Sequence, residues 1–139
     1  MRTCVVDTGI VFALFDANDS WHERAVTFAN QFPGKLVLPQ TVIPESAYLI
    51  NKYLGAEPEK HLIDACIRGE FAVEALNDKD LRRISVLLGQ YAQMNIGMVD
   101  ASVIAIAERL KTKEIATTDR RHFSVIQSAR GGTFTLLPV

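Results

Sequence analysis

The sequence is poor in the features that mark membrane, disulfide-rich or strongly basic proteins. No uninterrupted apolar run approaches the roughly 20 residues that a membrane helix needs, and the first residues lack a signal-peptide pattern. The two cysteines, Cys4 and Cys66, have no metal-ligand spacing and are predicted to be small, reduced, buried side chains. A formal net charge of −1 lacks the strongly basic footprint of a dedicated nucleic-acid binder. These absences predict a cytoplasmic protein that does not enter a membrane.

The chain has the composition of one globular domain. Its 139 residues are 48% hydrophobic, which is enough for a sizeable core. Short apolar runs alternate with amphipathic segments, a pattern that indicates parallel βαβ units. We therefore predict a single α/β domain over residues 1–139. It should have a central parallel sheet of about four to five strands with helices on both faces.

Hydrophobic periodicity places the individual elements. Strands are expected over residues 3–6, 35–38, 71–75, 114–117 and 133–137. Helices are expected over residues 10–15, 21–31, 42–54, 57–68, 78–91 and 99–110. Three helix starts carry capping signals: Ser20 with Glu23, Thr41, and Asn77 or Asp78.

Four carboxylates occupy equivalent topological places, two at the ends of predicted strands and two at helix starts that follow apolar runs; they are Asp7, Glu45, Asp100 and Asp119. In an open α/β sheet, strand ends and the helix starts that follow them share one edge, where ligands bind. Unit charges about 4 Å apart repel by roughly 4 kcal/mol at an effective dielectric near 20. Such a cluster needs either protons or a hard cation, and oxygen-bound Mg²⁺ or Mn²⁺ is the simpler answer. The pattern favours a metal-dependent enzyme.

Each carboxylate also has a purely structural interpretation as a helix cap or as a complement to a helix N-terminus. Four independent caps at one edge are the less economical explanation. Among the histidines, His22 and His61 are predicted to be exposed on helices, and His122 to pack beside Phe123 or to approach a ligand. None is predicted at the acidic edge, so no histidine nucleophile is invoked.

The segment Ile115–Phe123 resembles the C-terminal motif of the PIN-domain nucleases. Val5–Gly9, Pro44-Glu45 and Asp100–Ser102 match the other blocks of that family in the same order. The resemblance covers essentially the whole chain. Within the family, a single domain of this size is most similar to the bacterial VapC-type toxins.

The resemblance implies a PIN-like domain that acts as a Mg²⁺- or Mn²⁺-dependent endoribonuclease, the toxin of a VapBC-type toxin–antitoxin pair. It implies a VapB-like antitoxin whose tail crosses the site, an RNA substrate and a homodimer. The four carboxylates match the family's acidic metal-binding positions, and Thr117 matches the Ser/Thr that orders the site. Metal-held carboxylates can activate water for in-line attack on a phosphate, with one or two ions.

Other residues allow two interpretations each. Arg120 and Arg121 could contact RNA phosphates at the rim of the site, or lie in a solvated turn. The helices over 42–54 and 81–91 are the candidates for a dimer contact. Four aromatic side chains could line a groove for the antitoxin, although core packing is the favoured interpretation; they are Phe12, Phe15, Trp21 and Phe28.

Two alternatives to the ribonuclease stay open. One is a non-catalytic PIN-like module that binds RNA or protein, and the other is a nuclease of this fold acting on another nucleic acid. The triplet Asp7-Thr8-Gly9 also occurs in aspartic proteases, but those folds are all-β, and the helical periodicity of this chain excludes them.

Overall fold

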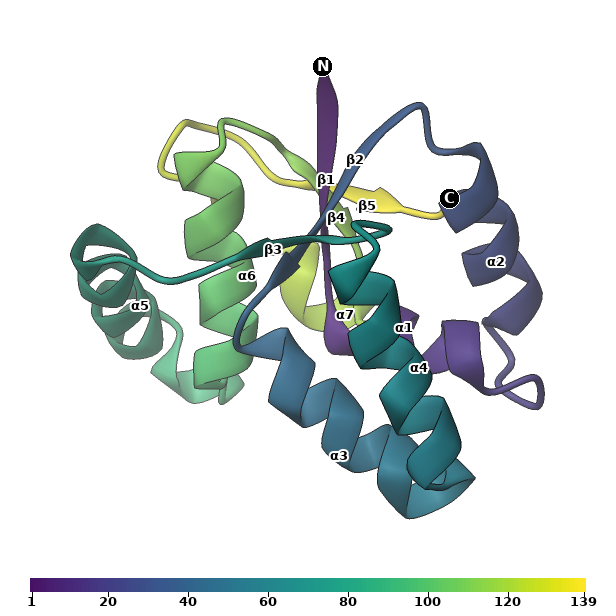
Figure 1. Cartoon of the computed structure of the whole chain (residues 1–139). Helices are drawn as coiled ribbons and strands as arrows, with labels where there is room; N and C mark the ends of the chain where they lie inside the picture. The colour runs from purple at the N-terminus through teal and green to yellow at the C-terminus, as the bar shows by residue number, and fades with distance from the viewer.

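The computed structural model describes all of residues 1–139 and shows one sheet of five strands, in the order β3-β2-β1-β4-β5 (Figure 1). Every pairing between neighbouring strands is parallel. The strands are β1 (Arg2–Val6), β2 (Gly34–Pro39), β3 (Ala72–Glu74), β4 (Glu114–Ala116) and β5 (Thr135–Leu137). The predicted α/β class and strand number are confirmed.

Seven α-helices and one 3₁₀ turn connect the strands. They are α1 (Thr8–Phe15), α2 (His22–Gln31), α3 (Val42–Leu54), α4 (Ala56–Ile67), α5 (Asp78–Gln90), η1 (Ala92–Met94), α6 (Met98–Arg109) and α7 (Arg120–Phe123). The six longer helices agree with the predicted ones to within about two residues at each end, a usual uncertainty. The short elements η1 and α7 were not predicted, because a single turn has no periodicity to detect.

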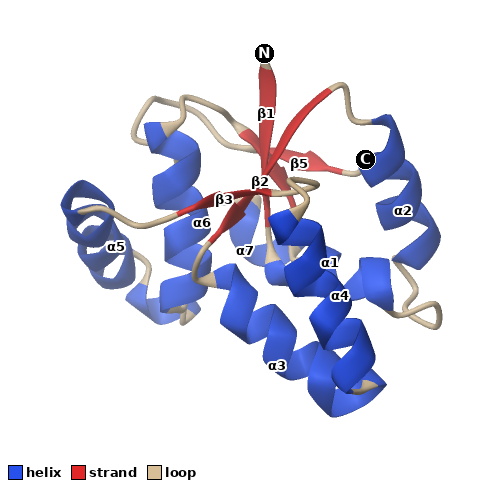
Figure 2. Cartoon of the chain, in the orientation of Figure 1, coloured by secondary structure: helices blue, strands red, loops and turns tan.

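The direction of strand addition reverses between β1 and β4. The chain winds outward from β1 to β2 and β3, then crosses back to β4 and β5. Because parallel crossovers are right-handed, such a reversal puts helices on both faces of the sheet. In Figure 2, α5 and α6 lie to the left of the strands, and α1, α2 and α4 lie to the right. A reversal of this kind opens a crevice at the carboxyl ends of the two central strands.

The core lies between the sheet and these helices. Cys4, Val5 and Val6 of β1 are fully buried, as expected for a central strand covered on both faces. Helix α6 is buried continuously from Ala101 to Glu108, so it forms the centre of one layer. Both cysteines are free thiols, although Cys66 is only half-buried. None of the helices combines the length and apolarity needed to cross a membrane.

The predicted capping box at the start of α2 is wrong. The helix begins at His22, and neither Ser20 nor Glu23 makes a capping hydrogen bond. Instead, the Asp19 carboxylate accepts a hydrogen bond from the Trp21 backbone N–H over 2.8 Å. The acceptor is therefore Asp19, one residue before Ser20, and the helix starts one residue later than predicted.

The other two capping predictions have opposite outcomes. Thr41 makes no capping bond to α3; its hydroxyl lies 2.6 Å from the Ser102 hydroxyl and links α3 to α6. Asn77 does cap α5, in a reciprocal box with Asp80 whose two hydrogen bonds are 2.9 and 3.0 Å long. The Thr41 hydroxyl is therefore used for packing between helices rather than for a helix start.

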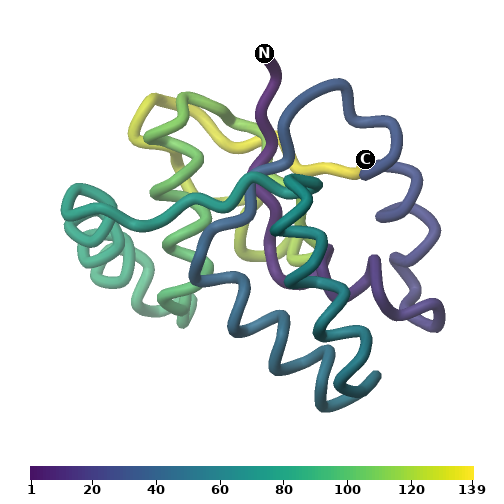
Figure 3. Tube along the Cα trace, in the orientation of Figure 1, coloured from purple at the N-terminus to yellow at the C-terminus, as the bar shows by residue number.

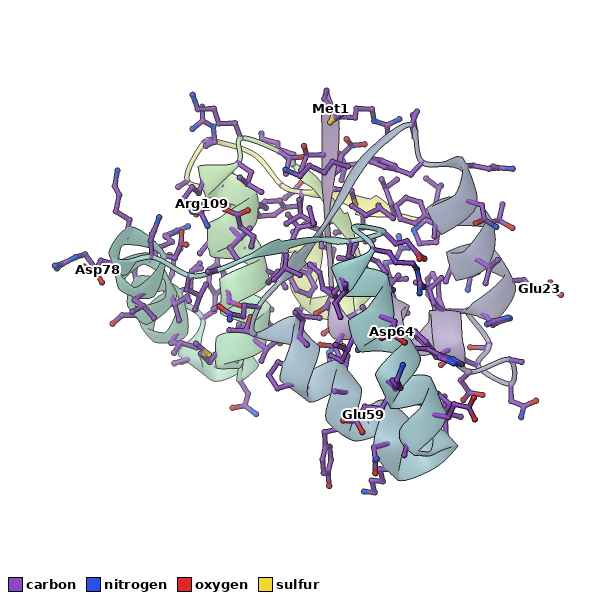
Figure 4. All side chains as sticks on the ribbon, viewed as in Figure 1. Met1, Glu23, Glu59, Asp64, Asp78 and Arg109 are labelled. Atoms are coloured by element: carbon purple, nitrogen blue, oxygen red, sulfur yellow. The ribbon has the colours of Figure 1, made fainter.

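A polar network fixes α5 against α6 and β3. Arg109, on the upper part of α6 in Figure 4, donates to both oxygens of buried Asp80 at 3.1 Å and to Glu74 at 2.8 Å. Arg83 of α5 donates twice to Glu108 of α6, at 2.8 and 3.1 Å. Together these bonds hold α6 in place, and the first turn of α6 carries Asp100.

Candidate metal centre

Asp7 follows β1 directly and lies at the switch point of the sheet. Its side chain is only 6% exposed and makes no capping hydrogen bond to α1. The backbone N–H of Asp7 donates to the Ala116 carbonyl at 2.9 Å, which ties it to the end of β4. The interpretation of Asp7 as a simple helix cap is therefore wrong, and the carboxylate faces the crevice between the central strands.

The electrostatics of Asp7 connect it to two other acids of the set. Burial, together with the neighbouring charges of Asp100 and Glu45, raises the pKa of Asp7 to about 7. Burial also raises the pKa of Asp100, and the charges of Asp119 and Glu45 add to the effect. The structure thus brings the four predicted carboxylates to one edge, where the charges of Glu45, Asp100 and Asp119 each raise the pKa of a neighbouring acid. Glu45 is the exposed member, on the first turn of α3.

Asp100, Asp119 and His122 form the tightest part of the cluster. One potential ligand atom from each lies within 4.8 Å of the others. Asp119 caps α7 by accepting from the His122 N–H at 3.0 Å, and its second oxygen lies 2.8 Å from His122 Nδ1. Because a carboxylate only accepts, Nδ1 is the donor in this contact, and the imidazole orients the Asp119 carboxylate.

The prediction that no histidine lies at the acidic edge is wrong for His122. The sequence carried a signal for it, since Asp119 and His122 are three residues apart and share one helical turn. The prediction for His22 is also wrong: it is half-buried, with Nδ1 2.7 Å from the Ala13 carbonyl oxygen. His61 is exposed on α4 as predicted.

Thr117 links the two central strands at the cluster. Its fully buried hydroxyl donates to Asp7 Oδ2 at 2.9 Å and accepts from the Asp119 N–H at 2.9 Å. The approach of α1 to this loop is close, because a Cβ on Gly9 would lie 2.2 Å from Thr118 Oγ1. Thr117 therefore sets the spacing between the Asp7 and Asp119 positions.

The two arginines after Asp119 point to different surroundings. Arg120 donates to the carbonyls of Leu136 and Pro138, and its guanidinium lies 5.0 Å from the Trp21 ring centroid. The C-terminal segment that receives these bonds returns beside α2 (Figure 3). Arg121 is exposed and makes no ion pair. Of the two predicted RNA contacts, Arg121 is the one whose guanidinium has no protein partner.

The predicted core role of the aromatic side chains is confirmed, since all four pack against the core while staying partly exposed; they are Phe12, Phe15, Trp21 and Phe28. Most acids outside the cluster are dispersed over the surface, and the two buried ones, Asp80 and Glu108, are paired with arginines. Figure 4 labels four of them on three helices, namely Glu23 on α2, Glu59 and Asp64 on α4, and Asp78 on α5. The acidic edge is thus a local feature and not part of a generally acidic surface.

The residues at this edge fit a hard divalent cation. Carboxylate oxygens with one imidazole suit Mg²⁺ or Mn²⁺, and a cation would relieve the repulsion that raises the pKa of Asp7. Two buried hydroxyls beside the cluster, Thr8 Oγ1 and Ser46 Oγ, have no hydrogen-bond partner in the protein. Buried polar atoms need partners, and a hydrated cation would bring water to this edge.

The fold and the acidic edge together define the class of protein: a doubly wound parallel α/β domain with a candidate divalent-metal site among the carboxylates at its switch point. Residues 4–127 match the family model described as PIN domain. The chain therefore belongs to the PIN-domain family, whose nucleases use a divalent metal.

Several relatives cover nearly the whole chain. A curated protein named ribonuclease VapC26, from Mycobacterium tuberculosis, is 28% identical over 134 residues, which are 96% of this chain and 99% of the relative. The solved structure of M. tuberculosis VapC20, described as a sarcin-ricin loop cleaving toxin, has a TM-score of 0.73 at 22% identity, covering 82% of this chain and 87% of that one. A toxin–antitoxin complex from Klebsiella pneumoniae has a TM-score of 0.71 at 20% identity, covering 88% and 92%. The two structures support the fold.

Proposed function

We propose that this protein is a Mg²⁺- or Mn²⁺-dependent endoribonuclease and the toxin of a VapBC-type toxin–antitoxin pair. The observation that carries the proposal is the buried Asp7 carboxylate, hydrogen-bonded to Thr117 and raised in pKa by burial and by neighbouring acids. A buried carboxylate beside other acids is more stable with a bound cation than as an ionised group without one. Membership of the PIN-domain family and a relative named as a ribonuclease support RNA hydrolysis.

Asp7, Glu45, Asp100 and Asp119 are assigned as the metal-binding acids. A bound divalent cation would supply Lewis-acid stabilisation and lower the pKa of a bound water. Asp7 must lose its proton before it can serve as a ligand, and the Thr117 hydrogen bond stabilises the ionised form. Exposed Glu45 faces the solvent side, where a phosphate would arrive.

His122 and Thr117 are assigned as positioning residues. Each makes a hydrogen bond to one of the acids, Thr117 to Asp7 and His122 to Asp119. Such outer partners fix the direction of a ligand's lone pairs and are worth about 10–100-fold in metal affinity or activity. Arg121 is the residue assigned to the RNA backbone at the rim.

The proposed partners are an RNA substrate, a VapB-like antitoxin and a second copy of the chain. A hollow of about 420 Å³ between α1, α2 and α4 is mostly apolar, which suits an amphipathic helix of the antitoxin. The solved K. pneumoniae relative is a toxin–antitoxin complex, which supports such a partner. The dimer contact is assigned to the exposed face of residues 81–91, which carries Leu81 and Val86. We propose the cytoplasm as the location of the protein.

Purified, antitoxin-free protein tests the proposal. It should cleave RNA in Mg²⁺ or Mn²⁺ and stop when EDTA removes the metal. A fragment carrying the sarcin-ricin loop is the first substrate, because the relative VapC20 is described as cleaving it. Mn²⁺ should also raise the melting temperature by mass action. Absence of cleavage on total RNA in both metals, with a normal Mn²⁺ shift, would favour a non-catalytic PIN module instead.

A further inference from the structure

A second hollow lies at the far end of α1 from the acidic centre. It measures about 410 Å³ and is lined by Phe12, Asp16, Asn18, Tyr53 and Leu54. Nothing in the metal centre uses these residues. The hollow combines two aromatic rings, a carboxylate and an amide, which is a mixture typical of a site for a planar polar ligand.

The aromatic wall is held in place but open to solvent. The Phe12 and Tyr53 rings meet edge to face, with centroids 6.0 Å apart and an interplanar angle of 81°. Tyr53 nevertheless stays 62% exposed. A large ring that is fixed at one edge and exposed elsewhere is a surface on which a nucleobase can stack.

A lysine without an acidic partner stands beside this wall. Lys52 Nζ lies 5.3 Å from the Tyr53 ring centroid and makes no ion pair. An exposed ammonium next to an exposed aromatic ring combines a phosphate contact with a base platform, the pairing used to bind single-stranded nucleic acid. The charge of Lys52 thus favours a nucleotide over a neutral ligand.

Asp16 supplies a fixed hydrogen-bond acceptor in the hollow. Its Oδ1 accepts from the Asn18 backbone N–H at 3.0 Å, which orients the carboxylate, and Oδ2 has no protein partner. A carboxylate offers about four lone-pair sites, so both oxygens can still accept. Among the four RNA bases, only guanine presents two adjacent N–H donors on its Watson–Crick edge. A bidentate pair with Asp16 would therefore select guanine.

The hollow and the metal centre lie at opposite ends of one helix. Asp7 precedes α1 and Asp16 follows it. Nine residues at a rise of 1.5 Å each separate them by about 13 Å. A short single strand could place a phosphate at the acids and a nearby base in the hollow.

We propose that the Phe12–Asp16–Tyr53 hollow binds a guanine base of single-stranded RNA, and so determines which phosphodiester bond reaches the metal centre. This inference rests on the proposed nuclease function and deepens it. Lys52 binds a phosphate of the same strand. Asp16 gives the selectivity, and the two rings provide a stacking surface that accepts any base.

The test is the cleavage preference of the wild type and of Asp16→Asn on a pool of RNAs with a randomised segment, sequenced after limited digestion in Mn²⁺. The wild type should favour guanine at one position near the cut. Asp16→Asn should lose that preference and cleave guanine-containing targets roughly 10-fold more slowly. It should still cleave other sequences at the wild-type rate, because an amide keeps the Asn18 bond. Asp78→Asn on exposed α5 is the matched control and should behave as the wild type.

Two outcomes would overturn the inference while leaving the nuclease intact: no guanine preference in the wild type, or the same preference in Asp16→Asn. Complete lack of cleavage would instead defeat the proposed function. In that case, fluorescence anisotropy measures the affinity of each protein for a labelled oligoadenylate that carries one guanosine. Equal affinities of the wild type and Asp16→Asn would overturn the proposed guanine site. If Tyr53→Ala weakens antitoxin binding but leaves the cleavage pattern unchanged, the hollow belongs to a protein partner and the inference is wrong.

Discussion

The Thr117 hydroxyl joins Asp7 to the loop that carries Asp119. It donates to Asp7 Oδ2 and accepts from the Asp119 N–H, each over 2.9 Å. Asp7 follows β1 and Thr117 follows β4, so this one hydroxyl spans the point where the sheet reverses its winding. The spacing of the acidic centre therefore depends on a side chain that cannot itself carry negative charge.

Replacing that hydroxyl should weaken the centre without unfolding the protein. Thr117→Val keeps the shape but removes both hydrogen bonds, so we expect about 10–100-fold lower Mn²⁺ affinity. Thr117→Ser keeps the hydroxyl and should stay close to the wild type. Calorimetric titration with Mn²⁺ measures both variants. Equal affinity of the valine and serine variants would show that the hydroxyl does not order the site.

The metal-free protein should lose stability as the pH rises. Burial raises the pKa of Asp7 from its ordinary 3.8 to about 7. Between these values the folded state holds a proton that the unfolded chain has released, so raising the pH favours unfolding. The contribution is complete below about pH 4 and lost above about pH 7.

Denaturant unfolding in EDTA across this range measures the effect. Asp7→Asn should remove the Asp7 part of the slope and raise metal-free stability at neutral pH by about 1–2 kcal/mol. In saturating Mn²⁺ the wild type should show the opposite trend, because metal binding requires the ionised acids. If wild type and Asp7→Asn have the same slope in EDTA, the pKa of Asp7 is not raised by folding, and this part of the account is wrong.

The ion-pair network beside α6 should matter for stability in proportion to its burial. Arg109→Met leaves buried Asp80 without its guanidinium partner, which should cost about 3–5 kcal/mol. Arg68→Met removes a pair with Glu70 in which both side chains are more than half exposed, and should cost no more than about 1 kcal/mol. Urea titration compares the two variants. Similar losses of stability in the two variants would contradict a stabilising role for the buried Arg109–Asp80 pair.

His122 should contribute to the centre through Asp119. His122→Asn removes the imidazole that lies 2.8 Å from Asp119 Oδ2, so we expect roughly 10-fold weaker Mn²⁺ binding with the fold retained. His61→Asn on exposed α4 is the control and should have no effect. Thermal shift against Mn²⁺ concentration gives both affinities, and unchanged binding in His122→Asn would remove the histidine from the site.

The sequence predicts the sheet, its helices and the grouping of four acids, because these follow from local periodicity and from parallel topology. Asp7 and Asp119 end apolar runs, and strand ends in such a fold share one edge. Thr117 was assigned through family resemblance, and its hydrogen bond to Asp7 joins residues 110 positions apart in the chain. A bond of that kind has no local signature in a single sequence.

Features that depend on distant or very short segments were not predictable in the same way. His122 reaches the acids because Asp119 caps a helix of four residues, too short for a periodic pattern. Arg120 turns away because the chain's last residues return beside α2. The pairing of Arg109 with Asp80 joins two helices. In the sequence alone, each of these charged side chains could equally well be exposed to solvent.

The most direct measurement of the central claim is metal-dependent RNA cleavage by the wild type, Asp7→Asn and Asp78→Asn, prepared identically and free of antitoxin. The wild type and Asp78→Asn should cleave at the same rate in Mn²⁺ and not in EDTA. Asp7→Asn should lose more activity than the roughly 10–100-fold typical for an outer partner of a metal site. Equal cleavage by Asp7→Asn, or cleavage that persists in EDTA, would contradict a metal-dependent nuclease centred on Asp7.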